Sequence, residues 1–132
     1  MPVLAIDLGG TKLATAVVDS QGRILSSRKE PVVRSSPGAT VDQIAAECNS
    51  VVASSGVSWD GISRVGLIVP GVAAPDGRVW APNLWGNAEI PLASELSHWR
   101  RIFDEEETST RDELDEEGRR TPLATARTWI KS

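Results

Sequence analysis

The sequence predicts a single α/β domain with a mixed sheet, which opens with antiparallel hairpins and later gains a parallel strand. Three observations predict it. Two short apolar runs meet at a Gly-Gly pair, a helical apolar period follows over residues 40–52, and a run that is apolar on both faces spans residues 65–69. The length of 132 residues fits one domain, and an apolar content of 40% supports a buried core.

The first three strands are expected from the turns that separate them. Residues 3–6 and residues 13–18 are apolar, and the Gly-Gly pair between them predicts a β-hairpin. A third strand over residues 23–29 follows the turn-forming residues 19–22. The chain is therefore expected to open with three antiparallel strands.

A helix and a parallel strand are expected next. Thr40 is expected to cap the helix while Gln43 reaches back to it, and Gly56 is the expected stop. Residues 65–69 are apolar on both faces, which predicts a central strand beneath a helix. Because a helix separates the third and fourth strands, the crossover implies a parallel pairing in the sheet.

The rest of the folded region is expected to hold a short strand over residues 78–80 and a last helix. Pro91 suits the first turn of that helix. Its inward-facing residues are expected to be Leu92, Leu96, Trp99 and Phe103.

Charge divides the chain into two regions. Residues 1–99 hold 9 Asp/Glu and 7 Lys/Arg, whereas residues 100–132 hold the same numbers in a third of the length. Only one apolar side chain, Leu114, lies between residues 104 and 121. Such a stretch buries too little surface to offset its ordering entropy. We therefore expect a folded domain over 1–103 and a charged, poorly ordered tail over 104–132.

Composition excludes several classes of protein. No apolar run reaches the length of a membrane span, and the start of the chain lacks the pattern of a signal peptide. The single cysteine, Cys48, excludes a disulfide framework and a multi-cysteine zinc site, and it is expected in the core. The single histidine, His98, is expected to pack against the fold or to face solvent. A net charge of −4 gives no general attraction to nucleic acid or to anionic membranes. We expect a cytoplasmic protein.

The strongest local motif is Asp7-Leu8-Gly9-Gly10-Thr11-Lys12. Glycines at a strand turn let backbone N–H groups approach a phosphate, while Thr11 adds a donor and Lys12 a positive charge. Asp7 stands where a carboxylate can hold Mg²⁺. The spacing is not that of a Walker A loop. The alternative is that Gly-Gly only makes a hairpin and that the charges are solvated.

Several motifs together resemble a known family. The motif from Asp7 to Lys12 resembles the first phosphate motif of the actin/hexokinase superfold. Residues 66–72 (GLIVPGV), 77–84 (GRVWAPNL) and 90–96 (IPLASEL) resemble the ROK (repressor, open reading frame, kinase) family of sugar kinases and regulators. The resemblance runs in register from Val3 to about Trp99.

This resemblance implies the N-terminal lobe of an RNase H-like, glucokinase-like enzyme. Members transfer a phosphoryl group from ATP, with Mg²⁺, to hexoses such as glucose or N-acetylglucosamine. By resemblance, Gly71 and Asn83 would lie at the sugar. The residues that would face the nucleotide phosphates are Asp7, Gly9, Gly10, Thr11 and Lys12.

Other interpretations of the sugar side stay open. Asn83 is also typical of an asparagine that caps a loop. The chain has Trp85-Gly86-Asn87 where family members often have Pro-Gly-Trp, so the substrate is not set by this loop. Trp80 or Trp85 suits stacking on a sugar ring, but large aromatic residues beside a sheet are more often core.

The family's catalytic base has no counterpart, so no catalytic residue is expected. In the family that base is an Asp after an Asn, and the sequence holds no Asn-Asp pair. The family's second lobe and its His/Cys zinc segment also have no counterpart. We expect a lobe cut short, or shifted in frame, near residues 99–103, inactive alone and prone to self-association. The alternative is a sugar- or nucleotide-binding regulatory module or a complementing subunit.

Overall fold

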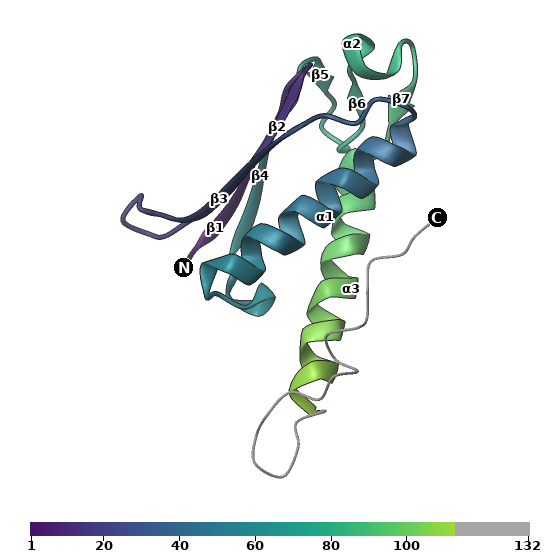
Figure 1. The fold of residues 1–132 in the computed structure, drawn as a ribbon. Coiled ribbons are helices and arrows are strands. Elements are labelled where there is room, and N and C mark those ends of the chain that lie inside the picture. Colours follow the sequence, from purple (N-terminus) through teal and green to yellow (C-terminus); the bar gives the residue numbers. More distant parts are fainter. Residues whose placement is uncertain (113–132) are drawn as a thin grey trace.

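A computed structural model describes residues 1–112, with side chains as far as Glu107 (Figure 1). Its main sheet has four strands in the order β3-β2-β1-β4. The β1–β2 and β2–β3 pairs are antiparallel and the β1–β4 pair is parallel, so the predicted mixed sheet is confirmed. The strands are β1 (Val3–Leu8), β2 (Lys12–Val18), β3 (Ile24–Pro31) and β4 (Arg64–Ile68).

The two faces of the sheet differ because side chains alternate along each strand. Leu4, Ile6 and Leu8 of β1 are buried and face helix α1 (Pro37–Ser55), which lies across this side of the sheet (Figure 1). The opposite face carries small residues. They are Ala5, Ala14, Ala16 and Gly66, which stand in register or one row apart. We call this side of the sheet the open face.

The N-cap of helix α1 lies four residues earlier than the sequence predicts. Ser36 is the N-cap, and its Oγ accepts a hydrogen bond from the Ala39 N–H at 3.0 Å, with Pro37 in the first turn. The predicted capping box at Thr40 is therefore wrong, because the nearby Ser-Pro pair provides the cap. The predicted stop is confirmed, since Gly56 ends the helix with a left-handed φ of +78°.

Strand β4 lies at the edge of the sheet rather than in its centre. Within residues 1–112 it pairs only with β1, so the prediction of a central strand is wrong for the described part of the chain. The apolar composition that prompted the prediction remains: Val65 and Ile68 are left exposed.

A second sheet is small and antiparallel. It consists of β5 (Val72–Ala73), β6 (Val79–Trp80) and β7 (Glu89–Ile90) in that order. The short helix α2 (Pro82–Trp85) connects β6 to β7.

Helix α3 (Leu92–Asp112) packs beside α1 and the 3₁₀ turn η1 (Trp59–Gly61). The inward-facing set is confirmed: Leu92, Trp99 and Phe103 are buried and Leu96 is half-buried. The helix continues past the expected boundary at residue 103, and residues 104–112 of the predicted tail are helical. The remainder of that tail lies outside the described residues.

Candidate functional site

The turn between β1 and β2 holds the predicted phosphate motif. The Gly9 N–H donates to the Lys12 carbonyl at 2.8 Å and closes the turn. The Thr11 carbonyl accepts from the Val32 N–H at 2.9 Å, which fixes the turn to the chain after β3. The side chains of Thr11 and Lys12 remain exposed. The backbone of the turn is thus held by the fold, and its polar side chains face outward.

The two glycines of the turn have different explanations. Neither has a positive φ, so the backbone angles do not require glycine. A Cβ at Gly9 would lie 2.9 Å from the Lys12 carbonyl oxygen, so the turn itself excludes a side chain there. A Cβ at Gly10 would meet nothing within 4 Å. A simple hairpin therefore accounts for Gly9 but leaves the glycine at position 10 unexplained.

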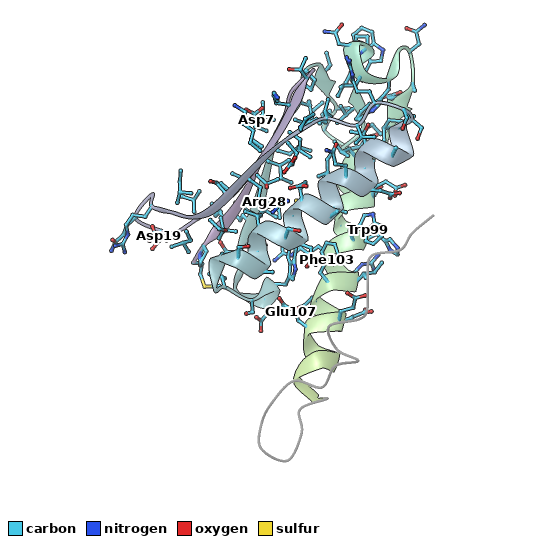
Figure 2. The ribbon with its side chains drawn as sticks, in the orientation of Figure 1. Asp7, Asp19, Arg28, Trp99, Phe103 and Glu107 are labelled. Atoms are coloured by element: carbon cyan, nitrogen blue, oxygen red, sulfur yellow. The ribbon has the colours of Figure 1, made fainter. Side chains whose placement is uncertain are left out.

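Asp7 lies on the open face, close to this turn. Figure 2 shows it on the side of the sheet away from α1, and its side chain is exposed. It borders a shallow hollow of about 520 Å³ that also meets Lys29 and the small residues Ala14 and Gly66. A carboxylate, an ammonium group and free space therefore lie together beside the Gly-Gly turn.

The residues predicted for the sugar follow β4 at the same end of the sheet. Asp7 pairs in parallel register with Ile68, so the Gly-Gly turn and Gly71 both lie just past the carboxyl ends of neighbouring strands. Figure 1 shows β5 and α2 at this end as well. Parallel strands place their carboxyl ends at one edge, where α/β sheets commonly bind ligands. The structure therefore brings both halves of the predicted site to one end.

Protein contacts explain the residue type at Gly71 but not at Asn83. Within residues 1–112, Asn83 is exposed and its side chain makes no hydrogen bond, so the structure offers no support for a loop cap. At Gly71, a Cβ would overlap the Trp80 carbonyl oxygen and lie 3.0 Å from the Cα of Ala81. Packing of the small sheet thus explains Gly71 without any ligand.

A buried hydrogen-bonded chain connects the two halves. Thr40 is completely buried; its hydroxyl donates to the Val33 carbonyl at 2.6 Å and accepts from the Trp85 indole N–H at 3.1 Å. Val33 follows the residue that holds the Thr11 carbonyl. Sequence reasoning missed this link, since it paired Thr40 with a helix cap. Trp85 is therefore core, whereas Trp80 is 43% exposed.

A family model described as the ROK family matches residues 3–102. The chain belongs to the ROK family. An N-acetyl-D-glucosamine kinase from Salmonella paratyphi A is 32% identical over 92 residues, which are 69% of this chain and 29% of that protein. A glucokinase from Streptomyces coelicolor is 37% identical over 65 residues, which are 49% of this chain and 20% of that protein.

Solved structures agree with this assignment to the ROK family. A ROK family glucokinase from Streptomyces griseus, in complex with glucose and AMPPNP, matches with a TM-score of 0.62 and 30% identity over 74% of this chain and 30% of its own. A ROK hexokinase from Thermus thermophilus matches with a TM-score of 0.68 and 27% identity over 76% of this chain and 33% of its own. The chain spans a third or less of the length of these relatives. The predicted sugar-kinase lobe fold is confirmed.

Cys48 and His98 lie where the sequence of this ROK chain predicts them, in the core and in solvent. Cys48 is buried in α1, and burial raises the pKa of its thiol to about 12, so it stays neutral in the core. His98 is exposed on α3. Among residues 1–112, no group of three His, Cys, Asp or Glu side chains could hold a metal ion. In the same part of the chain, no helix is long and apolar enough to cross a membrane.

Proposed function

We propose that residues 1–103 form one lobe of an ATP-dependent hexose kinase and supply the phosphate-binding half of its site. The observation that carries this proposal is the unfilled space at Gly10, in a turn whose backbone is fixed and whose polar side chains point outward. A position where the fold tolerates a side chain but the sequence has none is suited to close approach of a ligand. Residues 104–132 are proposed as a charged segment and not as a domain.

Each residue of the turn then has a distinct role. The Gly9 N–H already bonds Lys12, so Gly9 shapes the turn, and Gly10 leaves room for the phosphates. The Lys12 ammonium pairs with phosphate oxygens and the Thr11 hydroxyl donates to them. Asp7 is placed to hold Mg²⁺, which usually binds through one or two carboxylates together with substrate phosphates. When bound, the ion offsets phosphate charge.

On the sugar side, Asn83 offers both a donor and an acceptor to hexose hydroxyls, because its amide is free within the described residues. Gly71 would lie beside the sugar through its backbone. The Thr40–Trp85 hydrogen bond holds the Asn83 helix against the segment that fixes the phosphate turn. Hexose and nucleotide would thus be oriented by one connected framework. We place this protein in the cytoplasm and propose neither nucleic acid nor membrane as its partner.

A second candidate function is favoured by the absence of the family's Asn-Asp pair from the sequence. Phosphoryl transfer to a hydroxyl needs a positioned carboxylate to accept the proton. The chain would then act as a sugar- or nucleotide-binding regulatory module, or as a subunit that complements another chain. The family match ends at residue 102, and we attribute the change of composition near residues 99–103 to truncation or a frame change in a longer kinase gene.

Residues 1–132 alone are expected to show no hexose kinase turnover. The physical reason is the missing base, since binding of ATP and hexose without a proton acceptor leaves the transfer uncatalysed. A coupled assay of ADP release with glucose and with N-acetylglucosamine checks this. The control is the Asp7→Ala variant measured beside the parent chain. Turnover above background that disappears in this variant would contradict the prediction.

Nucleotide binding is expected to depend on Gly10. Gly10→Ala should weaken binding of Mg²⁺-AMPPNP about tenfold, which corresponds to about 1.4 kcal/mol. It should leave the free energy of unfolding unchanged or raise it by up to about 1 kcal/mol, because the added methyl group meets no protein atom and alanine restricts the unfolded chain. Titration calorimetry and urea denaturation provide the two measurements.

The matched control is Gly38→Ala, in the first turn of α1, where a Cβ has no neighbour closer than 4.0 Å. It should change neither the affinity for nucleotide nor the fold. If the parent chain does not bind Mg²⁺-AMPPNP, the phosphate-site proposal fails. If both variants bind Mg²⁺-AMPPNP as tightly as the parent chain does, Gly10 has no role in nucleotide binding.

A further inference from the structure

The segment at the end of β3 lies between the Gly-Gly turn and helix α1. The Val32 N–H donates to the Thr11 carbonyl of the turn at 2.9 Å. Helix α1 contacts the same segment through Gln43, whose Oε1 accepts from the Val33 N–H and whose Nε2 donates to the Pro31 carbonyl, both at 2.7 Å. Gln43 is therefore connected to the Gly-Gly turn through a short series of hydrogen bonds.

The Gln43 amide takes the place of a peptide group of a neighbouring strand. Backbone groups of successive residues in a strand point to opposite sides. Val32 points toward the Gly-Gly turn, so Pro31 and Val33 offer a carbonyl and an N–H on the other side, where no strand within residues 1–112 pairs with β3. A side-chain amide carries both an acceptor and donors on one planar group. Gln43 thus satisfies two backbone groups that no described strand reaches.

We propose that Gln43 is a positioning residue for nucleotide binding, which it supports by fixing the conformation of the Gly-Gly turn. It holds residues 31–33, and Val32 in turn holds the Thr11 carbonyl. This role rests on the proposed function of the turn as a phosphate site. A turn already held in its binding conformation loses less conformational entropy when the ligand binds, which raises affinity. Sequence reasoning paired Gln43 with Thr40 in a capping box, because the true partners of the amide are 10 and 12 positions away.

Glu47 provides the matched control. It lies one turn further along α1 than Gln43, and both side chains are half-buried. Glu47 also joins α1 to β3, since its Oε2 accepts from Arg28 Nε at 2.6 Å. Arg28 lies within β3, before the segment that contacts the turn. Loss of the Glu47 contact therefore loosens the same helix from the same strand without releasing the turn.

Nucleotide affinity is the first measurement. Gln43→Met keeps a side chain of similar length and removes both hydrogen bonds. It should weaken binding of Mg²⁺-AMPPNP by the full chain about three- to tenfold, because the turn is then in its binding conformation for a smaller fraction of the time. Glu47→Met should bind as the parent chain does. Gln43→Glu should fall between the parent and Gln43→Met, because its carboxylate still accepts from Val33 but cannot donate to Pro31.

Hydrogen exchange separates positioning of the turn from a general loss of stability. The exchange of single amides is followed by nuclear magnetic resonance in the full chain without ligand. In Gln43→Met, the Val32 N–H should exchange at least about tenfold faster than in the parent, because local opening becomes easier. The amides of Ala5 and Ala16, which face each other in the β1–β2 pair, should exchange as they do in Glu47→Met.

Four results would count against this role. If Val32 in Gln43→Met exchanges as slowly as in the parent, Gln43 does not hold the turn. If Glu47→Met weakens nucleotide binding as much as Gln43→Met, general loosening of α1 explains both variants. If Gln43→Met exchanges faster at Val32 yet binds with the parent's affinity, the turn binds without this support. A parent chain that does not bind Mg²⁺-AMPPNP refutes the phosphate site and with it the role of Gln43 in binding. The exchange result, measured without ligand, then shows separately whether Gln43 holds the turn.

Discussion

Trp59→Ala is expected to lower the free energy of unfolding by about 3–5 kcal/mol, the usual cost of truncating a buried aromatic side chain. Trp59 is 2% exposed, and its ring stacks on Phe103 with centroids 5.0 Å apart. Its indole N–H donates to Asn49 Oδ1 at 3.0 Å, and its backbone N–H donates to Glu107 Oε2 at 2.7 Å. The Trp59 side chain thus joins η1 to both α1 and α3. Figure 2 labels Phe103 and Glu107, the two residues of α3 that Trp59 contacts.

Urea denaturation followed by far-ultraviolet circular dichroism measures the effect. Trp59→Phe is the graded variant, because it keeps an aromatic ring in the stack and loses the indole hydrogen bond, worth about 0.5–1.5 kcal/mol. Trp80→Ala is the control for removing an indole group from a side chain that is 43% exposed. A Trp59→Ala variant no less stable than Trp80→Ala would show that α3 does not depend on this contact.

The same contact explains why the charged region could not be placed from the sequence. Composition alone predicts that residues from Asp104 onward are solvated, since about half of the residues there are charged. Yet a helix already anchored by Phe103 extends with little further cost per residue. Glu107 then finds the Trp59 backbone N–H, a partner 48 positions away. Long-range partners of this kind leave no local pattern.

Patterns that act locally were sufficient for the first strands. Alternation in β1 and β2 shows which residues face α1, and the Gly-Gly pair marks the hairpin between them. The start of α1 was misplaced because two capping signals lie four residues apart, at Ser36 and Thr40, and only tertiary contacts show that Thr40 serves Val33 and Trp85 instead.

Strand β4 shows a different limit. Its apolar composition is typical of a strand that is buried on both faces, as a central strand is. In the described residues one side of it is bare. The prediction was wrong about the position of β4 among the described residues, because composition shows which surroundings suit a strand and not which strands lie beside it.

In the candidate site too, local features could be predicted from the sequence and long-range contacts could not. The phosphate motif could be found from its spacing, because all its residues belong to one hairpin. The Thr40–Trp85 link could not, since it joins residues 45 positions apart. For Gly71, the sequence offered a role at the sugar, while the structure adds a packing reason for glycine. These two explanations predict different results for one substitution.

Gly71→Ala is expected to lower the free energy of unfolding by about 3 kcal/mol, at the upper end of the usual cost of overpacking. The added Cβ would overlap the Trp80 carbonyl oxygen and press on the Cα of Ala81. Both neighbours are backbone, so no side chain can rotate away. Relief requires separating the Val72–Trp80 pair of the small sheet, which also carries α2 and Asn83. Urea denaturation gives the stability, and hydrogen exchange over residues 72–80 gives its location.

Gly10→Ala provides the matched comparison, because it adds the same methyl group where no protein atom is near. If packing explains Gly71, its variant loses stability and early exchange appears in β5 and β6. Gly10→Ala is then at least as stable as the parent chain and keeps its protection from exchange. If Gly71→Ala keeps full stability and exchange protection yet binds glucose more weakly, the glycine is present for the sugar and the packing explanation is wrong. The pair therefore separates a glycine that the fold requires from one that only a ligand would require.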